Sequence, residues 1–157
     1  MAAAVLKLIE GEVLFVEGEL NSDLFILKLG EIRIIKEKQG RLMVIRIIKK
    51  GDFVGEVSLF TGRKLQGATG VAITPCEIIK IPKSDIMAVL DSRPPWVFEV
   101  MKDLTEKLAL TGQVMKEQSI HKDEVTRNIE ILTPMMEGKY LNSIEDYRRK
   151  KGIFVQK

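Results

Sequence analysis

Cysteine and histidine are almost absent from the chain, which has one of each among its 157 residues. A single cysteine cannot close a disulfide within the chain, and so little cysteine is typical of a protein from a reducing compartment. Protein zinc sites draw mainly on cysteine and histidine side chains, so one of each excludes a site built from them. We therefore predict a cytoplasmic protein with no disulfide, no bound metal and no cofactor.

Signals for membrane insertion, secretion and catalysis are missing too. No apolar run approaches the roughly 20 residues that a membrane-spanning helix needs. The opening stretch, MAAAVLKLIEGE, lacks a leading charged segment, and Lys7 and Glu10 interrupt its apolar residues, so we expect no signal peptide. The chain contains neither G-x-x-x-x-G-K-[ST] nor G-x-S-x-G, and residues 12–81 hold no histidine for a metal-dependent barrel enzyme. We expect no enzyme activity.

Apolar and charged residues are plentiful, at 45% and 30% of the chain. A chain of this size buries roughly 70% of the surface that its unfolded form exposes, so it can build a proper core. The formal net charge is only +3, too small to indicate nucleic acid by itself. Residues 139–157 hold six basic and two acidic residues. We interpret their basic cluster over 148–151 as a solvated helix end; the alternative is a phosphate-contacting patch.

Short apolar runs separated by turn-forming residues fill the first half of the chain. Runs rich in Ile, Val, Leu and Phe recur every 8–15 residues between positions 12 and 81. Short strands at this spacing predict an antiparallel β sandwich or barrel. Residues 31–48 predict a hairpin with its turn near Lys38, Gln39 and Gly40. The six predicted strands are EVLFV, DLFILK, EIRIIKE, RLMVIRII, GVAI and CEIIKI.

After Pro82 the apolar spacing becomes helical. Ser84 is a predicted N-cap for a short helix through Leu90, and a long helix is predicted over about 95–118. Its inner positions are three and four residues apart, which is a heptad pattern. This pattern predicts a homodimer formed through the long helix; the alternative is a helix packed on its own barrel. The predicted dimer residues are Val97, Met101, Leu104, Leu108, Thr111 and Met115.

The remaining residues predict a short helical tail. Apolar spacing over 120–132 indicates one helix, which would end at Thr133 and the proline after it. Asn142 and the serine after it are predicted to cap a last short helix through Lys151, with Gly152 ending it.

The stretch GDFVGEVSLF at residues 51–60 is the most informative in the chain. It stands in an ordered series with LFVEGELNSDLFIL, KLGEIRI and CEIIKI, followed by two helices. Together these elements resemble the cyclic nucleotide-binding domain family, that of the catabolite activator protein and its relatives. The resemblance covers roughly residues 11–118, and 119–157 would be a short, helical, basic tail. The fold it implies is α+β and mainly β: an antiparallel β-roll, or jelly-roll barrel, followed by a long dimerisation helix.

The resemblance also implies a nucleotide pocket. A cyclic phosphate carries one negative charge, and glycines let backbone N–H groups approach it closely. Gly55 and Glu56 would take the backbone and ribose roles, Gly67 and Ala68 would face the phosphate, and Thr111 would touch the base edge. The implied ligand-binding residues are Gly55, Glu56, Val57, Ser58, Leu59, Gln66, Gly67, Ala68 and Thr111.

One position departs from the family pattern. Gln66 stands where the family places its phosphate-binding arginine. Glutamine donates a hydrogen bond but carries no charge, and losing a charged hydrogen bond costs about 1.5–3 kcal/mol, or about one to two decades of affinity. Arg63 and Lys64 lie in the same loop and are candidate replacements; the alternative is that both are solvated loop charges. Glu56 has an alternative too, as a structural carboxylate that pairs with a loop cation.

These observations predict a non-catalytic regulatory or sensor domain. It would bind cAMP, cGMP or a related second messenger in the β-roll and signal through its C-terminal helices. The alternative is a degenerate domain that binds no nucleotide and serves as a protein-interaction scaffold. Activators of this family continue into a winged helix-turn-helix, whereas the 39 residues after Gln118 show no pair of strands for a wing. We therefore expect no DNA binding, and a partner protein is the candidate ligand of the tail.

Overall fold

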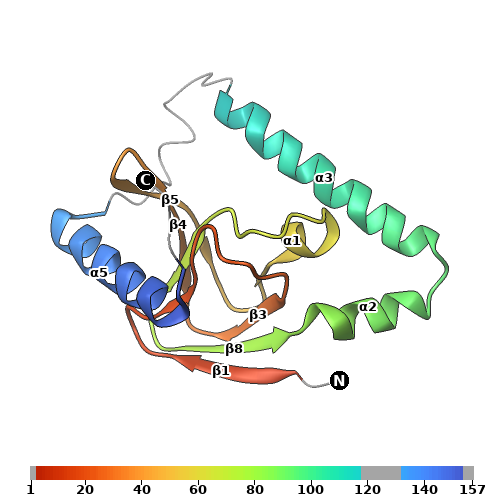
Figure 1. The fold of residues 1–157 in the computed structure, drawn as a ribbon, viewed down its shortest axis with the longest axis horizontal. Coiled ribbons are helices and arrows are strands. Elements are labelled where there is room, and N and C mark those ends of the chain that lie inside the picture. Colours follow the sequence, from red (N-terminus) through yellow and green to blue (C-terminus); the bar gives the residue numbers. More distant parts are fainter. Residues whose placement is uncertain (1–2, 118–131, 154–157) are drawn as a thin grey trace.

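The computed structural model describes residues 3–117 and 132–153, which form two antiparallel sheets with helices around them (Figure 1). All six predicted strands are present, and the predicted mainly β roll followed by helices is confirmed. The sheets are four-stranded, in the orders β1-β8-β3-β6 and β2-β7-β4-β5. The strands are β1 (Ala4–Leu8), β2 (Val13–Phe15), β3 (Leu24–Leu29), β4 (Ile32–Lys38), β5 (Arg41–Ile48), β6 (Phe53–Val54), β7 (Thr69–Ala72) and β8 (Cys76–Ile81), and the helices are α1 (Glu56–Phe60), α2 (Lys83–Asp91), α3 (Trp96–Glu117) and α5 (Pro134–Lys151).

The predicted hairpin is formed by β4 and β5. Lys38 pairs with Arg41, which leaves Gln39 and Gly40 as a two-residue turn. Both turn residues have positive φ, 54° and 75°, as a type I′ turn requires of its two central residues. The prediction of a turn at these residues is confirmed.

The two sheets face each other across a core that takes apolar residues from both. The rings of Phe15 and Phe25, one from each sheet, stack with centroids 5.9 Å apart. Cys76 is buried in the same core, and burial raises the pKa of its thiol. Cys76 is therefore part of the apolar core.

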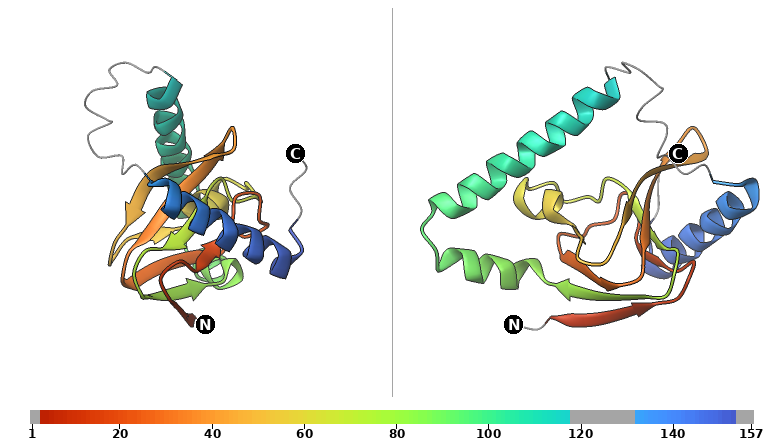
Figure 2. Two further views of the ribbon diagram at one scale, coloured as in Figure 1. Left: turned by 90° about the vertical axis from the view of Figure 1, so that its left-hand side faces the viewer. Right: turned by 180° about the vertical axis from the view of Figure 1, so that it is seen from behind.

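The outer face of the β2-β7-β4-β5 sheet is covered by α5 (Figures 1 and 2). Tyr140 and Ile144 of α5 are 5% and 2% exposed and pack on apolar residues of this sheet. Arg33 points to the same face, where its guanidinium lies over the Tyr140 ring and donates a hydrogen bond to the Tyr140 hydroxyl. The first four residues of β4 are therefore buried on both faces of the sheet, whereas its last three residues are exposed.

The start of α5 corrects the predicted helix in the tail. Asn142 and Ser143 lie inside α5 and do not cap it. The cap is Thr133, whose side chain accepts a hydrogen bond from the Met136 N–H at 3.3 Å, with the proline at the first helical position. Gly152 ends the helix with φ 66°, as predicted. The helix predicted over 120–132 lies outside the described residues, apart from Leu132.

The start of α2 is a second correction. Its N-cap is Pro82, so Ser84 does not cap it. Asp23, which is distant in sequence, caps the helix instead, because its Oδ1 accepts a hydrogen bond from the Lys83 N–H at 3.2 Å. The long helix α3 is confirmed over nearly its predicted range; α2 leads away from the roll, and α3 turns back and passes α1 (Figures 1 and 2). Among residues 3–117 and 132–153, no helix is long and apolar enough to cross a membrane.

Candidate functional site

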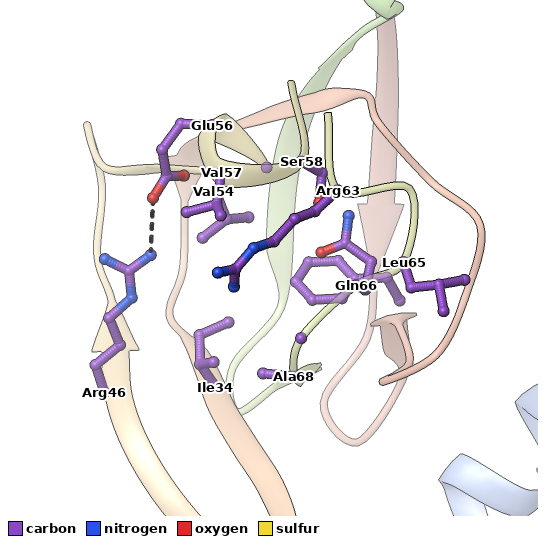
Figure 3. A pocket seen from close by; sticks show the side chains of 13 residues that line it. Ile34, Arg46, Val54, Glu56, Val57, Ser58, Arg63, Leu65, Gln66 and Ala68 are labelled. Atoms are coloured by element: carbon purple, nitrogen blue, oxygen red, sulfur yellow. Dashed lines mark ion pairs between the residues drawn. The ribbon is translucent and has the colours of Figure 1, made fainter. Parts of the chain in front are cut away.

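A cavity of about 350 Å³ opens into the roll beside α1 (Figure 3). Its walls come from β2, β4, β5, β6, α1 and the segment over residues 63–68. Small-molecule sites in proteins are commonly about 300–1,000 Å³ in volume, so a small ligand fits. The lining residues are Phe15, Ile34, Arg46, Val54, Gly55, Glu56, Val57, Ser58, Arg63, Leu65, Gln66, Gly67 and Ala68.

Gly55 brings the chain into α1 along a path that only glycine follows easily. Its φ is 106°, a conformation that other residues rarely adopt. A Cβ at this position would lie 2.2 Å from the Asp23 carbonyl oxygen. Because the backbone of residue 55 passes so close to β3, Glu56, Val57 and Ser58 come to lie at the cavity.

Two arginines reach the cavity. The side chain of Arg63 extends into it from the segment over 63–68, and its guanidinium group lies among the apolar side chains of the wall (Figure 3). Arg46 approaches from β5, with its Nη2 3.9 Å from Oε1 of Glu56. The charged lining is therefore two cations and one carboxylate, which suits a ligand with one negative charge.

The sequence analysis missed Arg46, and a β-bulge explains why. Residues 44 and 46 would share a face in a regular strand, so Arg46 would point with Val44 toward α5. The pairing of β4 with β5 shifts at this point: Ile34 pairs with Arg46, whereas Ile35 pairs with Val44. The extra residue turns Arg46 to the cavity side, a change of direction that bulges commonly produce beside functional sites.

Gln66 ties the cavity wall to the loop before β3. Its side-chain N–H donates to the Asn21 carbonyl oxygen at 3.0 Å, and its backbone N–H donates to that of Glu19 at 2.9 Å. Its own carbonyl oxygen accepts from the Gly18 N–H at 2.9 Å. Gln66 is only 7% exposed, and these hydrogen bonds give it a structural role in the cavity wall.

The structure brings most of the predicted ligand-binding residues together. Gly55, Glu56, Val57, Ser58, Gln66, Gly67 and Ala68 all line the cavity, as does Arg63. Two predicted residues do not line the cavity: Leu59 is buried in the core, at 2% exposure, and Lys64 is exposed to solvent. The side chain of Thr111 lies outside the described residues. Besides Arg46, the lining residues that the sequence analysis missed are Phe15, Ile34, Val54 and Leu65.

Comparisons with known proteins agree on one family. Residues 5–93 match the family model for the cyclic nucleotide-binding domain. The chain is 25% identical over 98 residues to the cAMP-activated global transcriptional regulator CRP of Salmonella typhimurium, covering 62% of this chain and 47% of the regulator. It is also 30% identical over 115 residues to the mouse voltage-gated inwardly rectifying potassium channel KCNH7, covering 73% of this chain and 9% of the channel.

A solved structure supports the fold. The cAMP-bound form of the EAL enzyme Bd1971 matches with a TM-score of 0.60 at 19% identity, over 74% of this chain and 32% of that one. At this identity the likeness shows the fold alone. The chain spans about half the length of the CRP regulators that it matches.

Proposed function

The chain belongs to the cyclic nucleotide-binding domain family, and from this premise we propose that it is a non-catalytic sensor of cAMP or cGMP. The observation that carries the proposal is the guanidinium of Arg63 inside the cavity (Figure 3). Gln66 cannot neutralise a phosphate, but Arg63 enters the same cavity three residues earlier in the chain and carries the required charge. The ligand-binding role predicted for the cavity residues belongs to this proposal.

The groups around the cavity match the parts of a cyclic nucleotide. Arg63 would bind the cyclic phosphate through a forked, charge-assisted contact. No hydrogen bond or ion pair with another described residue engages its guanidinium. Glu56 would accept a hydrogen bond from a ribose hydroxyl, and the ion pair with Arg46 would hold its carboxylate in place. Gly67 and Ala68 have small side chains, so the cyclic phosphate could approach the backbone of these residues closely.

The helices offer a route for the signal. Val57 and Ser58 of α1 line the cavity, and Phe60 of the same helix contacts Phe98 of α3 with ring centroids 6.1 Å apart. Thr105, one of the buried polar residues, continues the inner face of α3. A ligand that moves α1 would therefore move α3, and a partner protein would sense this through the C-terminal helices.

The test is calorimetric titration of the full chain, stripped of ligand by unfolding and refolding, with cAMP and with cGMP. We expect micromolar binding of at least one of them and none of 5′-AMP, which lacks the cyclic phosphate. A ligand at 100 times its Kd stabilises the folded state by about 2.7 kcal/mol, so melting gives an independent readout. No heat and no shift in melting at 1 mM of either ligand would end the proposal.

A second candidate function is a protein-interaction scaffold, favoured by Gln66. Its side-chain amide is occupied by Asn21, so it makes a poor substitute for the missing arginine. The variant Gln66→Arg separates the two functions. If Arg63 already binds the phosphate, we expect Gln66→Arg to change the cAMP affinity by less than about threefold. A new charged hydrogen bond, by contrast, contributes about 1.5–3 kcal/mol, which is about one to two decades of affinity. A rise from undetectable to micromolar affinity would instead show a scaffold whose cavity has lost its phosphate contact.

The exposed face of α3 supports the predicted homodimer. Met101, Leu104 and Leu108 are 38%, 54% and 74% exposed and follow the predicted heptad positions; Val97 beside them is half-buried. A row of exposed apolar side chains on one helix is typical of an interaction surface. The side chains of Thr111 and Met115, which complete the prediction, lie outside the described residues.

We expect the double variant Leu104→Glu, Leu108→Glu to be a monomer, because two carboxylates on each helix would be buried and would repel each other across the interface. Sedimentation equilibrium at about 5 to 200 µM protein measures the change, which covers dissociation constants equivalent to about −7 to −5 kcal/mol. Glu106→Gln, an exposed substitution on the same helix, is the control and should leave the dimer intact. A wild-type monomer throughout this range would contradict the dimer.

A further inference from the structure

The cavity wall over residues 63–68 is paired on its outer side with the loop over residues 18–21. Leu20 and Leu65 form an antiparallel bridge. Backbone hydrogen bonds join Gly18 and Glu19 to Gln66 at 2.9 Å each, and the Gln66 side chain donates to Asn21. Any change in the position of the loop over 18–21 therefore reaches Gln66, Gly67 and the cavity.

Glu19 holds that loop through its carboxylate, which is buried. The residue is 8% exposed, and a buried carboxylate is stable only where donors satisfy it. Its Oε2 accepts a hydrogen bond from the Val16 N–H at 3.1 Å. Its Oε1 lies 3.2 Å from the hydroxyl oxygen of Tyr147, a residue of α5.

Tyr147 reaches the loop from α5. Its hydroxyl oxygen also lies 3.1 Å from the Leu14 carbonyl oxygen, so one proton serves two acceptors. Burial and the negative charge of Glu19 raise the pKa of the Tyr147 hydroxyl. The hydroxyl therefore keeps its proton and acts as a donor at neutral pH.

We propose that Tyr147 is a positioning residue for the ligand cavity, acting through Glu19 and Gln66, so that the docking of α5 and the binding of ligand strengthen each other. This inference rests on the proposed function of the cavity. Two hydrogen bonds that meet at Glu19 carry the inference. The Tyr147 hydroxyl donates to the Glu19 carboxylate, and the Gln66 N–H beside the cavity donates to the Glu19 carbonyl oxygen. Linkage requires the effect to be reciprocal: if α5 improves ligand affinity, the ligand stabilises α5 by the same factor.

The link can be broken without undocking α5. Tyr140 and Ile144 pack in the sheet-facing core of α5 independently of the Tyr147 hydroxyl, so Tyr147→Phe keeps the ring and loses only the donor. A matched control lies at the other end of the helix, where Glu137 Oε1 accepts a hydrogen bond from the Leu42 N–H at 2.8 Å. That contact is with β5 and away from the loop over 18–21, so Glu137→Gln perturbs α5 without touching the link.

The experiment titrates cAMP into the wild-type chain and both variants, and follows hydrogen exchange of the α5 amides with and without saturating cAMP. We expect Tyr147→Phe to weaken binding by about five- to tenfold, at the low end of allosteric couplings, and Glu137→Gln by less than about twofold. Saturating cAMP should slow exchange in residues 140–151 of the wild type, and this protection should shrink in Tyr147→Phe. Glu19→Gln, which leaves a single carbonyl acceptor for two donors, should weaken binding as well.

Two results would overturn the inference while leaving the sensor function intact. One is wild-type affinity in both Tyr147→Phe and Glu19→Gln. The other is an equal loss in Glu137→Gln, which would reduce the effect to general destabilisation of α5. Failure of the wild type itself to bind cAMP or cGMP is a different outcome, and it would overturn the proposed function together with this inference.

Discussion

Replacing Arg63 with alanine is expected to weaken cAMP binding by about one to two decades. A charged hydrogen bond contributes about 1.5–3 kcal/mol, and each 1.4 kcal/mol is tenfold in affinity. Arg63 extends into the cavity from the segment over residues 63–68, and Gln66 and Gly67 of the same segment also line the cavity (Figure 3). Gln66 has no charge to take over the phosphate. Calorimetric titration of the variant with cAMP measures the loss.

Lys64 provides the matched control for Arg63. It carries the same charge one residue later, but it does not line the cavity. Lys64→Ala removes the same charge from the loop as a whole. Because charges beyond about 8 Å are screened at 0.15 M salt, we expect this variant to bind cAMP within about twofold of the wild-type affinity. Equal losses in the two variants would mean that long-range attraction, and not a contact in the cavity, draws the ligand in.

The geometry of the guanidinium can be tested as well. Arg63→Lys keeps the charge but loses the planar fork that binds two phosphate oxygens, so we expect an affinity between those of wild type and Arg63→Ala. Moving the arginine to its usual family position, in the double variant Arg63→Ala, Gln66→Arg, should restore much of the binding. An unchanged affinity in Arg63→Ala would contradict the proposed phosphate contact.

Replacing Gly55 with alanine is expected to have the largest effect on stability. The φ of 106° at this residue costs other residues about 1–3 kcal/mol. The added Cβ would lie 2.2 Å from the Asp23 carbonyl oxygen, so backbone must shift as well, at a further cost of about 1–3 kcal/mol. We expect a total loss of about 3 kcal/mol or more from a stability that is typically 5–15 kcal/mol.

The position of Asp23 extends the damage beyond the cavity. Its Oδ2 lies 3.0 Å from the Lys80 Nζ, and its Oδ1 accepts the Lys83 N–H at the start of α2. Displacing Asp23 would therefore disturb β3, β8 and the first turn of α2 together. Urea unfolding followed by far-ultraviolet circular dichroism measures the loss as a lower midpoint.

Gly62 is the control for Gly55. Its φ is also positive, at 70°, but a Cβ there meets nothing within 4 Å. Gly62→Ala therefore carries only the conformational cost, about 1–2 kcal/mol. If the two alanine variants unfold at the same urea concentration, the close approach of residue 55 to β3 has no energetic weight.

Local patterns in the sequence were sufficient for most elements. The six predicted strands, the turn at Gln39 and Gly40 and the long helix α3 each depend on the spacing of apolar residues and on turn-forming residues nearby. The sequence analysis missed β1 and β6, which lie at the edges of their sheet. β1 is a strand because it pairs with β8, with Ala4 opposite Lys80, and no local pattern shows a partner so far along the chain.

Helix α5 shows how one local signal supports opposite predictions. Thr133 followed by proline is typical of a helix end when the apolar pattern before it is considered, and of a helix start when the pattern after it is considered. Packing decided between them, because Tyr140 and Ile144 are buried against the sheet only if the helix runs through them. Asn142 and Ser143, predicted as caps, then fall inside the helix.

The sequence by itself determined the family, the strand pattern and the place of Gly55, Glu56, Gln66 and the loop arginine, because these depend on residue type and short-range spacing. The tertiary structure alone decided which charges meet the cavity and what supports its wall. Arg46 enters because a bulge alters the pairing of β4 with β5. Tyr147 supports Glu19 across 128 positions of sequence. Register shifts and distant contacts depend on how the whole chain packs, and no local pattern of residues encodes them.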